Sequence, residues 1–157
     1  MIPIDSNVLV ILILGLIDPN LIGKDKRTSI YEKEDFYDLL NVIGAIDKLV
    51  VLPNIWTEVD NLLNHISGSY KYQYIEKITS TIRVTSEEYV KSYVATQSQS
   101  FINLGLTDSL IMDLAKKCDF LITDDSRLSD SARANGILVY DIKSIRNEKL
   151  KRKASKN

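Results

Sequence analysis

The stretch IPIDSN at residues 2–7 joins a short apolar run to an acidic residue, Asp5. The stretch FLITDD at residues 120–125 repeats this pattern, because its apolar run ends in Asp124 and Asp125. Short apolar runs of this kind are typical of strands that are buried on both faces of a parallel sheet. Since the carboxyl ends of parallel strands lie at one edge of the sheet, we expect these three carboxylates to meet in one crevice.

Two more acidic residues follow the same arrangement. Glu58 lies early in a predicted helix after the apolar run LVVL at residues 49–52, and Asp108 opens a predicted helix before residues 120–123. Each acidic residue taken alone is explained by a helix N-terminus or a turn, but their joint placement at one sheet edge is hard to explain by chance. Such a cluster of like charges is unfavourable unless a cation neutralises it. The sequence therefore predicts a metal site made of five acidic residues: Asp5, Glu58, Asp108, Asp124 and Asp125.

Helix and strand patterns alternate along the whole chain. The predicted strands cover residues 2–4, 49–52, 82–84, 120–123 and 137–140. The predicted helices cover residues 6–16, about 29–44, a segment ending near 65, 70–79, a segment opened by 85, a segment opened by 107, and 129–135. This order predicts the α/β class, as a three-layer α/β/α sandwich with a central parallel sheet of four to five strands.

Three helix starts are predicted from capping signals. Ser29 with Glu32, and Thr85 with Glu88, have the spacing of a capping box. Thr107 is the expected N-cap of the helix that contains Asp108.

The composition indicates one domain with a sizeable core, since 45% of the 157 residues are hydrophobic and 26% are charged. The single Cys118 excludes an internal disulfide and a multi-cysteine zinc site. The apolar run at residues 8–14 is too short to span a bilayer and has no basic residue before it. We therefore expect no export signal, no membrane segment and a cytoplasmic location.

The charge divides the chain into an acidic body and a basic tail. Residues 143–157 contain seven Lys or Arg side chains and one Glu, a net charge of +6. Because the whole chain carries −1, residues 1–142 carry −7. We expect a domain over residues 1–142 and a tail over residues 143–157 that is either an arm for a phosphate backbone or a solvated terminus.

The predicted site contains oxygen ligands without a His or Cys partner, which suits a hard cation, Mg²⁺ or Mn²⁺, better than zinc. A cation held in this way lowers the pKa of a bound water and stabilises charge that develops on a phosphodiester. Phosphoryl chemistry is therefore the leading class of reaction.

Four segments together resemble the PIN-domain nuclease family, which includes the toxin ribonucleases of bacterial and archaeal toxin–antitoxin pairs. The matching segments are IDSNVL at residues 4–9, residues 53–59, LTDSLI at residues 106–111 and LITDD at residues 121–125. The resemblance covers residues 1–142. It implies a metal-dependent endonuclease that hydrolyses RNA and leaves a 5′-phosphate, with a homodimer and an antitoxin protein as expected partners.

The resemblance also implies roles for individual residues. The catalytic acids would be Asp5, Glu58, Asp108 and Asp125, and Mg²⁺ or Mn²⁺ would be bound by these four and Asp124. Asn7 and Thr123 would be polar residues that hold carboxylates or water in place. The polar segment at residues 18–33 makes the separation of Asp5 from Glu58 longer than in the compact toxins, and it could be a substrate clamp, a dimer contact or a segment without function.

Three other classes of protein share part of this sequence pattern. A haloacid-dehalogenase-type phosphatase needs a second aspartate where this chain has Asn7, and a phosphoacceptor receiver domain needs an early acidic pair and a later strand-end lysine. The strongest rival is a PIN-like fold that binds RNA or protein without catalysis. Arg127 and Arg133, which follow the last acidic pair, are equally compatible with a phosphate backbone or with solvent.

Overall fold

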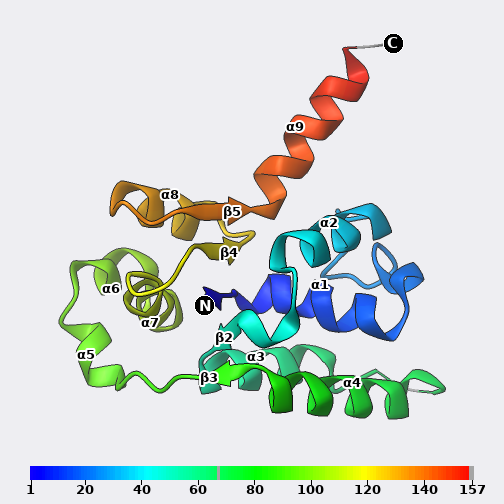
Figure 1. Cartoon of the computed structure of the whole chain (residues 1–157), viewed down its shortest axis with the longest axis horizontal. Helices are drawn as coiled ribbons and strands as arrows, with labels where there is room; N and C mark the ends of the chain where they lie inside the picture. Colours follow the sequence, from blue (N-terminus) through cyan, green and yellow to red (C-terminus); the bar gives the residue numbers. More distant parts are fainter. Residues whose placement is uncertain (67, 156–157) are drawn as a thin grey trace.

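The computed structural model describes residues 1–66 and 68–155 (Figure 1). The strands pair in parallel. Strands β1 (Ile2–Pro3), β2 (Leu49–Val51) and β3 (Ser86–Glu87) form a sheet in that order, with Ile2 opposite Leu49 and Val50 opposite Ser86. Strands β4 (Leu121–Thr123) and β5 (Val139–Asp141) form a second sheet. The predicted α/β class and parallel pairing are confirmed.

The two sheets meet beside Asp5. Ile4 forms an isolated parallel bridge with Ile122, and the backbone N–H of Asp5 donates to the carbonyl of Ile122 at 2.9 Å. This contact places the end of β1 next to β4, so the residues that follow each strand lie at a common edge. One central sheet of four to five strands in a three-layer sandwich stays a prediction.

The helices fall into two groups (Figure 1). The first group is α1 (Ser6–Ile17), α2 (Lys33–Ile43), α3 (Pro53–Leu63) and α4 (Tyr70–Val84), of which α1 contacts the other three. The second group is α5 (Ser92–Thr96), α6 (Gln99–Leu104), α7 (Leu106–Ala115) and α8 (Ser126–Ala134). The 3₁₀ turns η1 (Pro19–Leu21) and η2 (Ile46–Lys48) precede α2 and β2.

The first helix is buried on every side. All seven residues of the apolar run at 8–14 are buried, which explains why this helix lacks a polar face. Gly15 lets α1 approach α2, because a Cβ atom at this position would lie only 2.2 Å from the Phe36 ring. Across the described parts of the chain, the structure contains no helix with the length and apolarity that crossing a bilayer requires.

The predicted strand at residues 82–84 is wrong, because α4 continues to Val84 and the strand β3 begins only at Ser86. The buried side chains Tyr74, Ile78 and Thr81 follow helical spacing, so packing of that face outweighs the strand preference of the β-branched residues. The helix expected from Thr85 is also wrong, since this threonine is the C-cap of α4.

The other two helix-start predictions need correction as well. Helix α2 begins after Glu32, which forms a capping box with Asp35, rather than at Ser29. The N-cap of α7 is Gly105 instead of Thr107. In both places more than one residue is compatible with a helix start, so spacing alone does not fix the N-cap.

The basic tail is helical over α9 (Ile142–Ala154), which extends away from the strands in Figure 1. Arg146 forms salt bridges with Glu32, at 3.3 Å, and with Asp35. Lys149 forms a salt bridge with Asp38, also on α2. The first half of this helix is therefore attached to the acidic body.

Candidate active site

Asp5 is the most deeply buried acid of the predicted site, with 5% of its surface exposed. It directly precedes α1, and its carboxylate accepts hydrogen bonds from the Thr123 hydroxyl at 2.9 Å and the Ser6 hydroxyl at 3.3 Å. The pKa of Asp5 is raised to about 7, chiefly by burial and also by the negative charges of Asp124 and Asp108, while the Thr123 hydrogen bond acts in the opposite direction. In the metal-free protein, this carboxyl is therefore partly protonated near neutral pH.

Asp108 lies in the first turn of α7 and is half-buried. Its pKa is raised to about 6, chiefly by burial and also by the charges of Asp125 and Glu58. The positive charge of Arg127 opposes them. Asp5 and Asp108 are thus held close enough to other acids for each to resist ionisation.

Asp124 and Asp125 follow β4 but have different hydrogen-bond partners. The Asp124 carboxylate accepts from the Asn7 amide at 3.1 Å and from the Tyr31 hydroxyl at 3.0 Å. The Asp125 carboxylate accepts from the Leu128 backbone N–H at 2.9 Å and caps α8. One acid is therefore oriented by side chains from distant segments, whereas the other has a capping role within its own loop.

Thr123 connects the two ends of the site. Its hydroxyl donates to Asp5 and accepts from the Asp125 backbone N–H at 2.9 Å. The threonine is fully buried, so this geometry is protected from water. Asn7 and Thr123 both hold acidic residues in place, as the resemblance implies for them.

Glu58 lies on α3 and is exposed to solvent. It is near enough to Asp108 for its charge to raise the pKa of that carboxyl. The Asn54 amide of α3 donates to the Thr107 hydroxyl of α7 at 3.5 Å, which joins the two helices that carry these acids. Glu58 therefore belongs to the same electrostatic cluster, at its outer side.

The acids are suitable in chemistry for Mg²⁺ or Mn²⁺, but they are not arranged as a finished metal site. No group of three or more His, Cys, Asp or Glu side chains in the described ranges is placed to hold a metal ion. Carboxylate and hydroxyl oxygens are the donors that hard cations prefer. The pKa values of Asp5 and Asp108 are raised by burial and, to a smaller extent, by repulsion from neighbouring acids, and a bound cation would relieve that repulsion.

A polar hollow of about 300 Å³ adjoins the last acidic pair. The residues that line it are Asn7, Asp124, Asp125, Ser126, Arg127 and Lys143. Arg133 follows the last acidic pair in the sequence, as Arg127 does, but it does not line this hollow. It instead forms salt bridges with Asp130 at 3.9 Å and Asp141 at 4.0 Å. The structure thus separates two arginines that the sequence could not distinguish.

Tyr31 is a site residue that the sequence analysis missed. It comes from the polar segment at residues 18–33, is 2% exposed and donates to Asp124 from 93 positions away. No local motif marks this tyrosine, since the contact depends on how the segment folds back. The segment is itself packed onto the body, because Thr28 is fully buried and Ile22 is nearly so.

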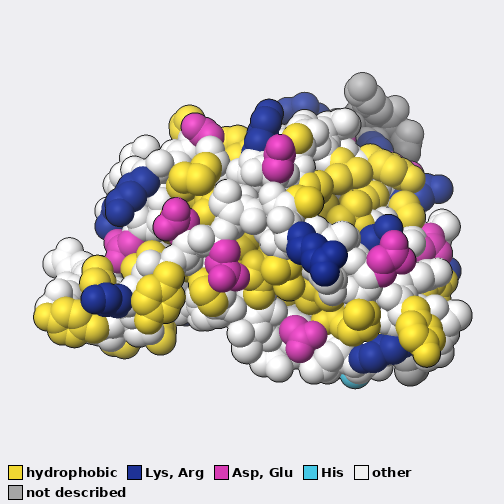
Figure 2. Space-filling model, turned by 60° about the horizontal axis from the view of Figure 1, so that its bottom comes forward, with side chains coloured by type: hydrophobic (Ala, Val, Ile, Leu, Met, Phe, Trp, Pro, Cys, Tyr) yellow, Lys and Arg dark blue, Asp and Glu magenta, His cyan; other side chains and the backbone are white. Residues whose placement is uncertain are grey.

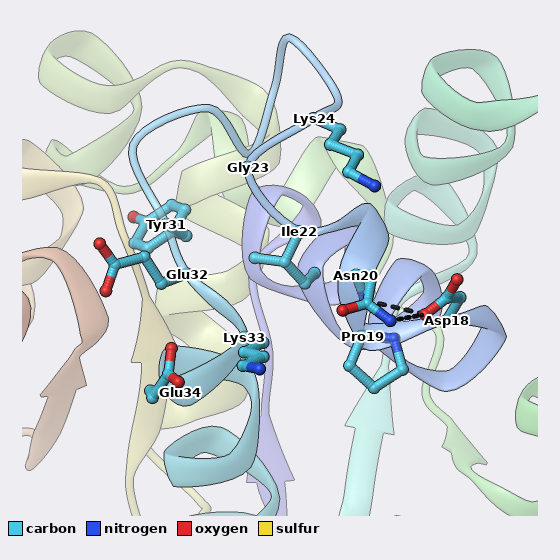
Figure 3. A pocket seen from close by; sticks show the side chains of 10 residues that line it. All are labelled: Asp18, Pro19, Asn20, Ile22, Gly23, Lys24, Tyr31, Glu32, Lys33 and Glu34. Atoms are coloured by element: carbon cyan, nitrogen blue, oxygen red, sulfur yellow. Dashed lines mark hydrogen bonds between the residues drawn. The ribbon is translucent and has the colours of Figure 1, made fainter.

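The same segment forms a second hollow, of about 570 Å³, between η1 and the start of α2 (Figure 3). Figure 3 shows Tyr31 and Glu32 on one side of this hollow and Lys24 and Asp18 on the other. Its lining contains more acidic than basic side chains, which disfavours an anionic ligand. The hollow beside Asp124 and Asp125 is the better candidate for chemistry on a phosphodiester.

No protein-family model, curated protein or solved structure matches this chain. Membership of the PIN-domain family therefore stays a prediction that rests on the four matching sequence segments.

Proposed function

We propose that this protein is a metal-dependent ribonuclease with a PIN-like three-layer fold. The observation that supports it most is the electrostatic coupling of five acids from four separate segments. Asp5 is coupled to Asp124 and Asp108, and Asp108 is coupled to Asp125 and Glu58. Purely structural acids at helix starts would have no reason to raise one another's pKa, because that repulsion lowers stability.

In this proposal Mg²⁺ or Mn²⁺ is held by carboxylates from the five acids: Asp5, Glu58, Asp108, Asp124 and Asp125. The cation would activate water for attack on phosphorus and stabilise the charge on the leaving oxygen. Thr123 and Ser6 fix the Asp5 carboxylate, and Asn7 and Tyr31 fix that of Asp124. These hydrogen bonds orient acidic oxygens before substrate arrives, which is the preorganisation that catalysis needs.

The alternative is a PIN-like module that binds RNA or protein without cleaving it. The absence of a preformed three-acid group within the described ranges favours this alternative.

A homodimer or an antitoxin would need an apolar surface, and the region around α4 and α5 offers one. Figure 2 shows hydrophobic patches on the face that lies at the bottom of Figure 1, the side of α4. Tyr72 of α4, Tyr93 of α5 and Tyr89, which precedes α5, are 86%, 67% and 75% exposed.

Cleavage of RNA tests the proposed function directly. Labelled single-stranded and structured RNAs would be incubated with the protein in Mg²⁺, Mn²⁺ or EDTA. We expect cleavage only with metal, and a loss of at least about 100-fold in the double variant Asp5→Asn plus Asp108→Asn, because carboxylates that bind the cation are removed. Asp47→Asn, an exposed acid in η2, serves as the control and should retain full activity.

Two outcomes would contradict the mechanism: cleavage in EDTA, or undiminished cleavage by the double variant. Binding of RNA without cleavage under any metal condition would support the non-catalytic module instead.

Replacing Tyr31 with phenylalanine is expected to lower the cleavage rate at saturating RNA about 10-fold while KM changes less than about twofold. The substitution removes one hydrogen bond to a charged carboxylate, worth about 1.5 kcal/mol, and leaves the packing of the ring in place. Steady-state kinetics would separate the two constants. Tyr37→Phe, on the neighbouring helix and 48% exposed, is the matched control, and an equal loss in that variant would refute a specific role for Tyr31.

A further inference from the structure

Two cations line the hollow that adjoins Asp124 and Asp125. Arg127 is the second residue of α8 and Lys143 is the second residue of α9. These helices follow the paired parallel strands β4 and β5. The two positions are therefore brought together by the strand pairing, although they lie 16 positions apart in the sequence.

Neither cation neutralises the acids of the hollow directly. Within residues 1–66 and 68–155, neither Arg127 nor Lys143 forms a salt bridge, whereas Arg146 and Lys149 of α9 pair with acids of α2. The Arg127 guanidinium donates to the Asn103 carbonyl, which anchors it at the rim. Both side chains are exposed and keep their charge available to a ligand in the hollow.

The chemistry of the hollow suits one part of an RNA strand. An anion is attracted to the two cations, but Asp124 and Asp125 line the same hollow and would repel a free phosphate. An RNA strand avoids this conflict because it carries several phosphates. One phosphate can lie at the acids, whose charge the bound metal offsets, while the next phosphate along the strand lies at the two cations. Arginine also matches two phosphate oxygens with its planar donors, and lysine adds a point charge.

We propose that Arg127 and Lys143 form a phosphate-binding subsite that holds the RNA backbone next to the phosphodiester to be cleaved. This inference rests on the proposed ribonuclease function. The subsite reads the backbone and not the bases, so it sets position and affinity without sequence preference.

The test measures binding separately from cleavage. Fluorescence anisotropy with a labelled single-stranded RNA, in EDTA, gives the affinity of the uncleaved complex as a function of salt. We expect Arg127→Gln and Lys143→Gln each to weaken binding about 5-fold at 50 mM salt. Each should also reduce the slope of log affinity against log salt by about 0.7, the amount for one phosphate contact on a single strand.

A matched control separates a local subsite from general charge. Lys151→Gln removes the same charge from α9 about 12 Å further along the helix. This control should change affinity less than about twofold, and Arg127→Lys should recover part of the loss. Thermal unfolding of each variant, followed by circular dichroism, checks that the fold is kept.

Equal weakening by Lys151→Gln and Lys143→Gln, or unchanged binding in both subsite variants, would overturn the subsite. If metal-dependent RNA cleavage persists in that case, the proposed function stands and only the subsite falls. If the wild-type protein neither binds nor cleaves RNA, the proposed function falls together with the subsite.

Discussion

Replacing Asp5 with asparagine is expected to stabilise the metal-free protein near neutral pH while reducing RNA cleavage by at least about 100-fold. The two effects have one cause, which is the burial of a carboxylate among other acids. A cation can use that carboxylate, but without a cation its ionisation opposes folding. The variant keeps an oxygen to accept from Thr123 and loses the negative charge.

The pH dependence follows from the raised pKa. Below about pH 4 Asp5 is protonated in both states, so it imposes no penalty. Between about pH 4 and pH 7 the unfolded chain releases this proton and the folded protein retains it. Asp5 therefore contributes a loss of stability of up to about 4 kcal/mol as pH rises through this window, and the asparagine variant lacks this contribution while keeping the smaller one of Asp108.

Urea unfolding in EDTA at pH 5 and pH 7.5 measures this difference. Asp35→Asn is the matched control, because Asp35 is equally buried but is paired with Arg146 and accepts from the Glu32 N–H at 2.8 Å. That variant should lose stability, and Mn²⁺ should stabilise the wild-type protein more than Asp5→Asn. A wild-type protein that is more stable than Asp5→Asn at pH 7.5 in EDTA would show that Asp5 is a structural acid.

Replacing Gly15 with alanine is expected to destabilise the protein by about 3 kcal/mol, although alanine is normally the better helix residue by about 1 kcal/mol. The added Cβ would lie 2.2 to 2.5 Å from three atoms of the Phe36 ring. Phe36 is 3% exposed and the surrounding side chains of α1 are buried, so the ring has little room to move. Denaturant unfolding gives the change in free energy.

A double variant shows whether the ring is the cause. Gly15→Ala combined with Phe36→Leu should be less destabilised than the sum of the two single variants, because the smaller side chain leaves space for the new methyl group. Gly15→Ala that is as stable as the wild-type protein would contradict the close contact of α1 and α2. This contact also bears on the site, since the segment between these helices carries Tyr31.

Much of the strand framework could be predicted because its signals are local. Short apolar runs predicted the strands β1, β2 and β4, and the acidic residues that follow these runs could also be identified from the sequence. The strand expected at residues 82–84 failed because the same β-branched residues can end a helix when its opposite face is buried. In that segment the strand preference of the individual residues is outweighed by packing of the buried face of the helix.

The sequence by itself determined the α/β class, the parallel pairing of strands and the identity of the acids that follow them, because these depend on short-range apolar patterns. Only the tertiary structure decided that Tyr31 holds Asp124, that Arg127 rather than Arg133 lines the hollow, and that Lys143 joins it. It also decided the raised pKa of Asp5. Each of these depends on burial or contact between segments far apart in the chain, and such contacts leave no trace in local composition or spacing.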